Sequence, residues 1–204
     1  MTLRAVLATG NPHKAQEIRD LLGDVPIELR TLGELGLTLQ VEEDGSTYRA
    51  NAMKKADAAA RKAGLPAIAD DSGIEVDALD GAPGIRSSRF AGEGGDDPLN
   101  NALLLERLDG VLPPDRTARF VCVAVWMPPP EGEGEPAVFR GEWEGRIAER
   151  PSGSEGFGYD PLFLVPEEGR TVAELGEEYK REHSHRARAF RALAAHLRAL
   201  ALGA

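Results

Sequence analysis

The chain has 204 residues, a net charge of −10 and 42% hydrophobic residues, a composition typical of a water-soluble globular protein. This length suits one domain or two small lobes that share a core. The acidic balance argues against a general nucleic-acid binder, but it leaves a nucleotide open as substrate. Because the sequence shows neither a membrane-spanning stretch nor a signal peptide, and Cys122 is its only cysteine, we expect a cytoplasmic protein without internal disulfides.

The first 22 residues predict a strand, a tight turn and a helix. Residues 3–9 are mostly apolar, and Gly10, Asn11 and Pro12 interrupt them. Asn11 is a good N-cap and Pro12 suits the first helical position, so a helix is expected over residues 12–22. The free N–H groups at such a helix start favour an anion, and Lys14 would reinforce that preference. An ordinary turn that binds nothing explains the same residues.

A second, longer helix is expected over residues 46–63. Alanines recur at positions 52, 56, 59 and 63, which gives one narrow stripe of small side chains that can pack closely on a sheet. Gly64 and Pro66 end the helix. Lys54 lies on its flank, and the acidic loop before it carries Glu42 and Glu43.

Residues 67–78 hold the densest group of chemically active side chains. Their pattern predicts a buried strand, a sharp break at the Asp-Asp-Ser-Gly sequence of residues 70–73, and a second strand. Asp70 and Asp71 would then lie at a strand end, where ligands of α/β folds usually bind. A pair of carboxylates suits Mg²⁺, although a solvated turn explains the same residues.

The rest of the chain alternates between expected helices and strands. Further strands are expected over residues 119–127, 137–139, 141–147 and 162–165, and helices from 97 to about 109 and from 171 to about 181. Ser184 would cap a last helix whose inner face carries Phe190, Leu193, Ala194 and Leu197.

Two further features point to a ligand. Residues 153–161 combine three glycines with Phe157, Tyr159 and Asp160, so their backbone can approach a ligand closely and an aromatic ring can stack on a base. A surface loop with Phe157 tucked into the core is the alternative. His185 and Arg186 lie in the first turn of the last helix, where the helix dipole disfavours cations, and such a violation can mark a site.

In this order, these motifs resemble one family closely. The resemblance rests on residues 7–14, 51–54, 67–73, 81–84, 156–161 and 184–186, and covers nearly the whole chain. The sequence is similar to the inosine triphosphate pyrophosphatases, also called non-canonical purine nucleoside triphosphate pyrophosphatases, and to their bacterial dITP/XTP branch. The resemblance implies an elongated α/β body of two lobes around a long mixed sheet with flanking helices, in a single domain over residues 1–204, with the active-site cleft between the lobes.

The resemblance also implies an activity. Family members hydrolyse ITP, dITP and XTP to the monophosphate and pyrophosphate with Mg²⁺, cleanse the nucleotide pool, and are usually homodimers. Asp71 would be the catalytic base, and Glu42 and Asp71 would hold the metal, with Glu43 as the alternative to Glu42. Substrate contacts would come from Thr9, Gly10, Asn11, Pro12, His13, Lys14, Lys54, Ser72, Phe157, Gly158, Tyr159, Asp160, Lys180, His185 and Arg186.

Different groups of these residues are expected to contact different parts of the substrate. Residues 9–14 and Lys54 would hold the triphosphate, and Phe157 would stack on the base. His185 and Arg186 would donate to O6 of the purine, which favours a 6-oxo base over the 6-amino group of ATP. Two other functions fit the same residues: a nucleotide-binding module without turnover, and a pyrophosphatase of modified pyrimidine triphosphates.

Overall fold

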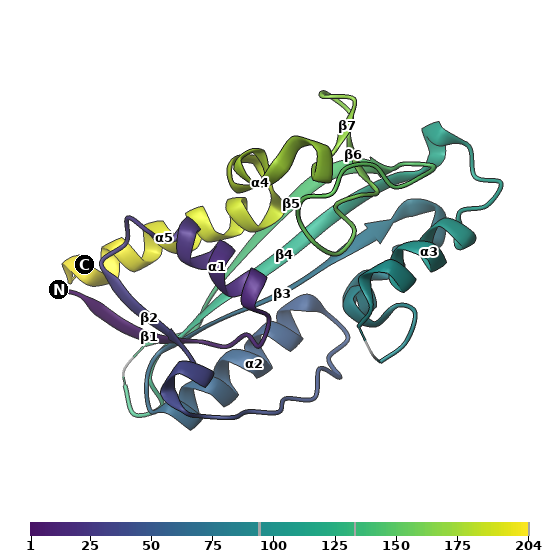
Figure 1. The fold of residues 1–204 in the computed structure, drawn as a ribbon. Coiled ribbons are helices and arrows are strands. Elements are labelled where there is room, and N and C mark those ends of the chain that lie inside the picture. Colours follow the sequence, from purple (N-terminus) through teal and green to yellow (C-terminus); the bar gives the residue numbers. More distant parts are fainter. Residues whose placement is uncertain (94, 133, 204) are drawn as a thin grey trace. The chain divides into compact units, whose positions relative to one another are not determined.

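The computed structural model describes residues 1–93, 95–132 and 134–203, and it has the expected mixed α/β fold (Figure 1). The strands of the described residues are β1 (Leu3–Leu7), β2 (Ile27–Thr31), β3 (Ala67–Val76), β4 (Thr117–Met127), β5 (Ala137–Ile147), β6 (Phe163–Val165) and β7 (Arg170–Thr171). The α-helices are α1 (Pro12–Leu21), α2 (Tyr48–Ala63), α3 (Asp97–Arg107), α4 (Val172–His183) and α5 (His185–Leu202).

The sheet combines both strand orientations. Its order is β2-β1-β3-β4-β5-β6-β7. Strand β1 pairs in parallel with β2 and β3, whereas β6 pairs antiparallel with β5 and β7. None of the helices among the described residues combines the length and the apolar composition that a membrane-spanning helix needs.

The chain divides into two compact units. Unit 1 comprises Met1–Asp71, Cys122–Gly141 and Arg186–Ala204, and unit 2 comprises Ser72–Val121 and Glu142–His185. Strands β3, β4 and β5 therefore contribute residues to both units. The single domain and the cleft between lobes stay predictions.

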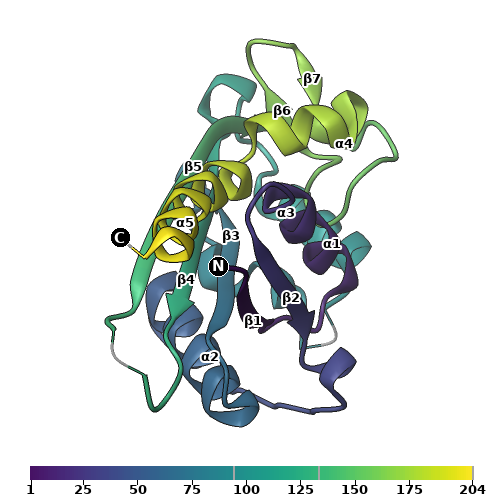
Figure 2. The same cartoon turned by 90° about the vertical axis from the view of Figure 1, so that its left-hand side faces the viewer.

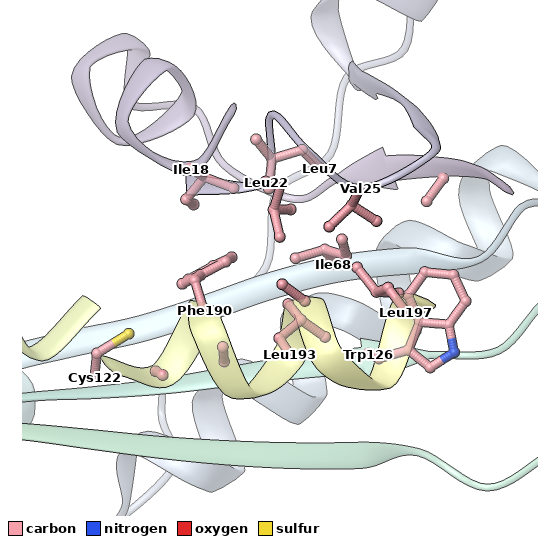
Figure 3. Packing of buried hydrophobic residues seen from close by; sticks show 14 of the residues in the cluster. Leu7, Ile18, Leu22, Val25, Ile68, Cys122, Trp126, Phe190, Leu193 and Leu197 are labelled. Carbon is pink, nitrogen blue, oxygen red and sulfur yellow. The ribbon is translucent and has the colours of Figure 1, made fainter. Parts of the chain in front are cut away.

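The core of unit 1 lies between α1, α5 and the strands. Phe190, Leu193 and Leu197 of α5 face Ile18 of α1 and Ile68 of β3, and all five side chains are buried (Figure 3). The expected inner face of the last helix is therefore confirmed. Burying side chains of this size stabilises the fold by roughly 2 kcal/mol each.

Helix α2 lies on the other side of the strands from α5 (Figures 1 and 2). Thr47 caps its start, because the Thr47 hydroxyl accepts from the Ala50 N–H at 3.1 Å, and Gly64 ends it in the left-handed conformation. Ala52, Ala56 and Ala59 are fully buried, as the alanine stripe predicts, whereas Ala63, its fourth member at the end of the helix, is only half-buried.

The core of unit 2 is richer in aromatic side chains. Phe163 packs against Phe120 and Trp143, with ring centroids 4.4 and 5.4 Å apart. Leu104 and Leu108 of α3 and Val172 of α4 complete the same cluster. Helix α4 begins with the predicted capping box, in which the Thr171 N–H donates to the Glu174 carboxylate at 2.8 Å, but Gly176 interrupts it with a φ of 87°.

The predicted break at residues 70–73 is wrong. Strand β3 runs unbroken from Ala67 to Val76, although its middle consists of residues typical of turns. Strand propensity is easily overridden by tertiary context, and here the Asp70 and Asp71 side chains have partners from other parts of the chain.

Candidate active site

Asp70 and Asp71 face opposite sides of the sheet. Successive residues of a strand alternate between its two faces. Asp70 follows Ile68, which lies in the core with α1 and α5, and Asp70 contacts Arg186 of α5. Asp71 points to the other face and contacts α2. The two carboxylates therefore do not form the pair that the sequence predicted, and each has its own surroundings.

The Asp71 side chain is held by two residues of α2. Asn51 donates from Nδ2 to Asp71 Oδ2 at 3.2 Å, and Lys55 Nζ lies 3.2 Å from Oδ1. Lys55 also donates to Glu43 at 2.9 Å, so one ammonium group bridges two carboxylates. Asp71, Asn51, Lys55 and Glu43 are called the Asp71 centre below.

The charges of this centre depend on one another. Burial raises the pKa of Asp71 above its ordinary value, and Lys55 and Lys14 offset only part of that effect. For Lys55, burial would lower the pKa, but the charges of Asp71, Asp70 and Glu43 outweigh it and raise the pKa. Lys55 is therefore a permanent cation, and the Asp71 carboxylate binds a proton more readily than an exposed aspartate does.

The Asp70 side chain belongs to a buried network. Its Oδ2 lies 3.4 Å from Arg186 Nε, 3.5 Å from Lys14 Nζ and 3.9 Å from the thiol of Cys122. Arg186 also donates to Glu17 of α1 at 2.7 Å. Burial would lower the pKa of Arg186, but Glu17 and Asp70 raise it, so the guanidinium stays charged in the core.

The first loop does not offer the free N–H groups that the sequence predicts. The Asn11 side chain accepts from the N–H groups of His13 and Lys14 at 2.9 and 3.1 Å, and the Asn11 carbonyl accepts from Ala15 at 3.0 Å. The Thr9 hydroxyl in turn accepts from the Asn11 N–H at 3.1 Å. Gly10, Asn11, Pro12 and His13 are exposed, and Lys14 is half-buried. An anion bound here would have to exchange with Asn11, or use Lys14.

Two of the expected residues lie at the rim of unit 1. Lys54 is exposed and donates to Asp44 at 2.6 Å, whereas its neighbour Lys55 points to Asp71. Glu42 is also exposed, and Glu43 is the loop carboxylate that shares Lys55 with Asp71. The geometry therefore places Lys55 and Glu43, rather than Lys54 and Glu42, in the Asp71 centre.

In unit 2, residues 153–160 form a tightly held turn, called the glycine loop below. Asp160 and Lys180 make a buried ion pair at 2.7 Å, and the same carboxylate accepts from the Phe157 N–H at 2.9 Å. The ammonium of Lys180 lies 4.0 Å from the centroid of the Phe157 ring. A Cβ on Gly156 would lie 2.2 Å from Asp160 Oδ2, so this position requires glycine.

Helix α3 holds the tip of the glycine loop. The Gly158 N–H donates to Asp97 at 2.7 Å, and Asn101 donates to the Gly158 carbonyl at 2.9 Å. The Tyr159 hydroxyl donates to the Ser87 carbonyl at 2.8 Å, and burial, followed by the charge of Asp97, raises the pKa of Tyr159. Tyr159 is therefore a buried anchor of the loop.

The last two predicted base-contacting residues have different neighbours. His185 is buried in unit 2 and stacks on Phe120 at 4.7 Å between ring centroids, whereas Arg186 belongs to the Asp70 network of unit 1. Ser72 directly follows Asp71 and is half-buried.

Comparisons with known proteins place this geometry in a family. The family model described as "Ham1 family" matches residues 5–196. The chain belongs to the Ham1 family. This confirms the resemblance drawn from the sequence motifs.

Relatives and solved structures in this family match along almost the full chain. A protein named dITP/XTP pyrophosphatase from Vibrio parahaemolyticus is 48% identical, over 96% of this chain and 97% of its own length. One of the same name from Yersinia pseudotuberculosis is 49% identical, over 92% and 94%. The structure of a HAM1 protein from Coxiella burnetii is 43% identical with a TM-score of 0.87, over 96% of this chain and 98% of that chain.

A second solved structure carries an enzyme's name in its title. It is titled nucleoside-triphosphatase / dITP/XTP pyrophosphatase from Mycobacterium abscessus, is 41% identical and has a TM-score of 0.76, over 94% of this chain and 98% of that chain. In this Ham1 chain, the strands and helices around the Asp71 centre therefore have counterparts in proteins that carry an enzyme's name.

The donor set of the Asp71 centre fits a divalent cation. Among the described residues, no cluster of three or more His, Cys, Asp or Glu side chains could hold a metal. Asp71 and Glu43 nevertheless converge on one cationic atom, Lys55 Nζ, at 3.2 and 2.9 Å. Carboxylate oxygens arranged around a cation are the ligands that Mg²⁺ prefers, with water and phosphate oxygens completing its shell.

Sequence reasoning missed Asn51, Lys55 and Glu17. Asn51 and Lys55 are four residues apart and border the buried alanine stripe, so their spacing puts both on the strand-facing side of α2. The sequence alone could therefore have placed these two side chains against the sheet. Glu17 had no comparable signal, because a glutamate in a surface helix is usually solvated.

Proposed function

We propose that this chain hydrolyses the non-canonical purine triphosphates ITP, dITP and XTP to the monophosphate and pyrophosphate, and so cleanses the nucleotide pool. The observation that carries the proposal is the Asp71 centre, where a buried carboxylate with a raised pKa lies against a lysine. Relatives that are 48% and 49% identical to this chain are named dITP/XTP pyrophosphatase, and these names support the proposed substrate class.

Asp71 is the proposed base. It takes a proton from the water whose oxygen attacks the α-phosphorus. The bond from that phosphorus to the bridging oxygen then breaks, and pyrophosphate leaves with the electron pair. The raised pKa makes Asp71 a stronger base than an exposed aspartate. Asn51 and Lys55 fix the orientation of its two oxygens.

Lysines of unit 1 are proposed to bind the phosphates. Lys14, with 21% of its side chain exposed, and Lys55, with 14%, are close enough to solvent to turn toward an anion. Lys54 is more exposed and keeps its expected role of a second phosphate contact. Each lysine loses a carboxylate contact when it turns to a phosphate, and for Lys55 a divalent cation near Asp71 would offset that loss.

The proposed cofactor is Mg²⁺, held by Asp71 with Glu42 or Glu43. When bound, it lowers the pKa of water and screens the leaving pyrophosphate. Glu42→Gln and Glu43→Gln separate the two candidate ligands, because only the true ligand should raise the Mg²⁺ concentration needed for half-maximal rate.

Base recognition is proposed to use the glycine loop and the start of α5. Phe157, backed by the Lys180 ammonium, offers a ring on which a purine can stack. His185 and Arg186 are the proposed donors to O6. A substitution of Arg186 would also break its buried ion pairs with Glu17 and Asp70, so a substitution of His185 tests base choice more specifically.

A substrate panel tests this function. The purified chain is incubated with Mg²⁺ and ITP, dITP, XTP, ATP, GTP or a modified pyrimidine triphosphate, and pyrophosphate is measured with a coupled inorganic pyrophosphatase. We expect kcat/KM for ITP, dITP and XTP to exceed that for ATP by at least about 100-fold, as unpaired polar groups in a site permit. Binding without turnover, or preference for the pyrimidine, would contradict the proposal.

The assembly and the location belong to the same proposal. A homodimer is expected from the resemblance, and light scattering after size-exclusion chromatography should give twice the mass of the chain. Fractionation of the producing cells should find the protein in the cytoplasm.

A further inference from the structure

We propose that Asn51 and Gly45 form a positioning link that holds the acidic loop, residues 42–45, against Asp71 and so sets the divalent-cation affinity of the Asp71 centre. The inference rests on the proposed function, because it takes Asp71 and a loop glutamate as the metal ligands. Asn51 and Gly45 act through those ligands and touch neither metal nor substrate.

Asn51 joins two elements through both ends of its carboxamide. It is fully buried, its Oδ1 accepts from the Gly45 N–H at 2.8 Å, and its Nδ2 donates to Asp71 Oδ2 at 3.2 Å. An N–H needs an acceptor and a carboxylate needs a donor, so the two partners fix the orientation of the amide. A buried amide satisfied at both ends transmits a displacement of one partner to the other.

Residue 45 must be a glycine because no space is left for a side chain at this position. A Cβ at this position would lie 2.5 Å from Asn51 Oδ1 and 2.9 Å from the Cβ of Ala50. The backbone of the loop approaches the start of α2 closely only because residue 45 lacks a side chain.

The link is one of several contacts that tie residues 43–47 to α2, and one of the others is the Lys54–Asp44 ion pair at 2.6 Å. Glu43 is tied to Lys55 at 2.9 Å, Gly45 to Asn51 at 2.8 Å, and the Thr47 hydroxyl to the Ala50 N–H at 3.1 Å. Loss of the Gly45–Asn51 bond removes the backbone contact next to Glu43 and Asp44, so only side-chain ion pairs with Lys55 and Lys54 then hold these residues. Loss of the Asn51 amide also removes the donor that orients Asp71. Outer hydrogen bonds of this kind are typically worth 10–100-fold in metal affinity.

The test disrupts the Gly45–Asn51 hydrogen bond by changing each partner in turn. Asn51→Ala removes the carboxamide that accepts the bond, and Gly45→Ala adds a Cβ that would clash with the Asn51 Oδ1. The double variant combines both changes. Mn²⁺ binding, with Mn²⁺ as the paramagnetic substitute for Mg²⁺, is measured by electron paramagnetic resonance without nucleotide. We expect each single variant to weaken Mn²⁺ binding by about 10-fold or more, and the double variant to be little worse than either, because both break one interaction.

Two controls match the substitutions. Gly33→Ala adds a methyl group where the nearest atom is 3.9 Å away. Asn100→Ala removes a second buried asparagine, one that holds the Ser88 carbonyl and the Ala91 N–H in unit 2. Both should keep wild-type Mn²⁺ affinity, and thermal unfolding reports the stability cost of each variant.

The outcomes separate the inference from the function. Mn²⁺ affinity within about twofold of wild type in folded Gly45→Ala, or additive effects in the double variant, would overturn the link. If Asn51→Ala does not fold, Gly45→Ala alone decides. Wild-type protein that binds Mn²⁺ with the expected variant effects but releases no pyrophosphate would contradict the function and leave the link standing.

Discussion

The Asp71 centre of unit 1 and the Asp160–Lys180 pair of unit 2 are two buried ion pairs built in different ways. In the Asp71 centre, Lys55 is 14% exposed, is shared by two carboxylates, and its nearer partner Glu43 is 33% exposed. Asp160 and Lys180 are each 3% exposed and contact each other at 2.7 Å. A partly exposed lysine that is shared by two carboxylates can leave one of them for a phosphate, and the freed carboxylate can then bind a metal. We call this the open centre. The fully buried Asp160–Lys180 pair, called the closed pair, instead fixes the shape of the glycine loop.

The largest effect is expected at the open centre. Asp71→Asn keeps the size of the side chain and the neighbours Asn51 and Lys55, but it removes the base. We expect pyrophosphate release from ITP to fall by at least about 100-fold, within the usual range for loss of a general base. Circular dichroism and the urea midpoint should show a folded protein. Near-normal turnover would contradict the role of Asp71.

Next in size is the loss of Arg186. Arg186→Met leaves the buried carboxylates of Glu17 and Asp70 without their guanidinium partner, which typically costs about 3–5 kcal/mol of unfolding free energy. Lys14→Met is the matched control, because it also contacts Asp70 but is partly exposed, so it should cost less than about 1 kcal/mol. Urea unfolding measures both. Equal costs would show that burial does not distinguish the two cations.

The closed pair should affect ligand binding through the loop. Lys180→Met leaves Asp160 buried and charged, and should cost roughly 3 kcal/mol of stability. It also removes the cation over Phe157, so KM for ITP should rise more than kcat falls. A fall in kcat with unchanged KM would place Lys180 in the chemical step instead.

Comparison of these pairs also shows what the sequence can predict. The end of α2 at Gly64, its buried alanines 52, 56 and 59, and the inner face of α5 follow from local patterns and are confirmed. Of the two adjacent lysines of α2, only Lys55 faces Asp71, because a helix turns by about 100° per residue. The spacing from Asn51 contains that information.

Other features depend on partners that local sequence does not show. Residues 70–73 are typical of a turn, yet they stay extended because distant side chains, Arg186 on one face and Lys55 on the other, stabilise the two carboxylates. The start of α1 is typical of an anion site, but Asn11 occupies its N–H groups. Capping and anion binding use the same donors, so a capping residue in the sequence leaves both open.

The smallest expected effect is at an exposed ion cluster of unit 2, which contrasts with the buried Asp160–Lys180 pair. The Thr117 hydroxyl has the largest effect and lowers the pKa of Asp77; burial opposes it, and Arg119 lowers the pKa further, so the pKa lies below its ordinary value. A lowered folded-state pKa stabilises the protein above the unfolded value of 3.8, and that contribution is lost as the pH falls through the folded value. Solvent screening limits it to about 1 kcal/mol.

The check is the difference in unfolding free energy between wild type and Asp77→Asn. It should shrink as the pH falls from 7 through the acid range. A difference that grows toward low pH would have the wrong sign for this cluster.

The most direct test of the central claim is hydrolysis of ITP in ¹⁸O-labelled water. If water activated at Asp71 attacks the α-phosphorus, mass spectrometry should find the label in IMP and none in pyrophosphate, and Asp71→Asn should abolish both products. Label in pyrophosphate, or release of IDP and inorganic phosphate, would contradict the account.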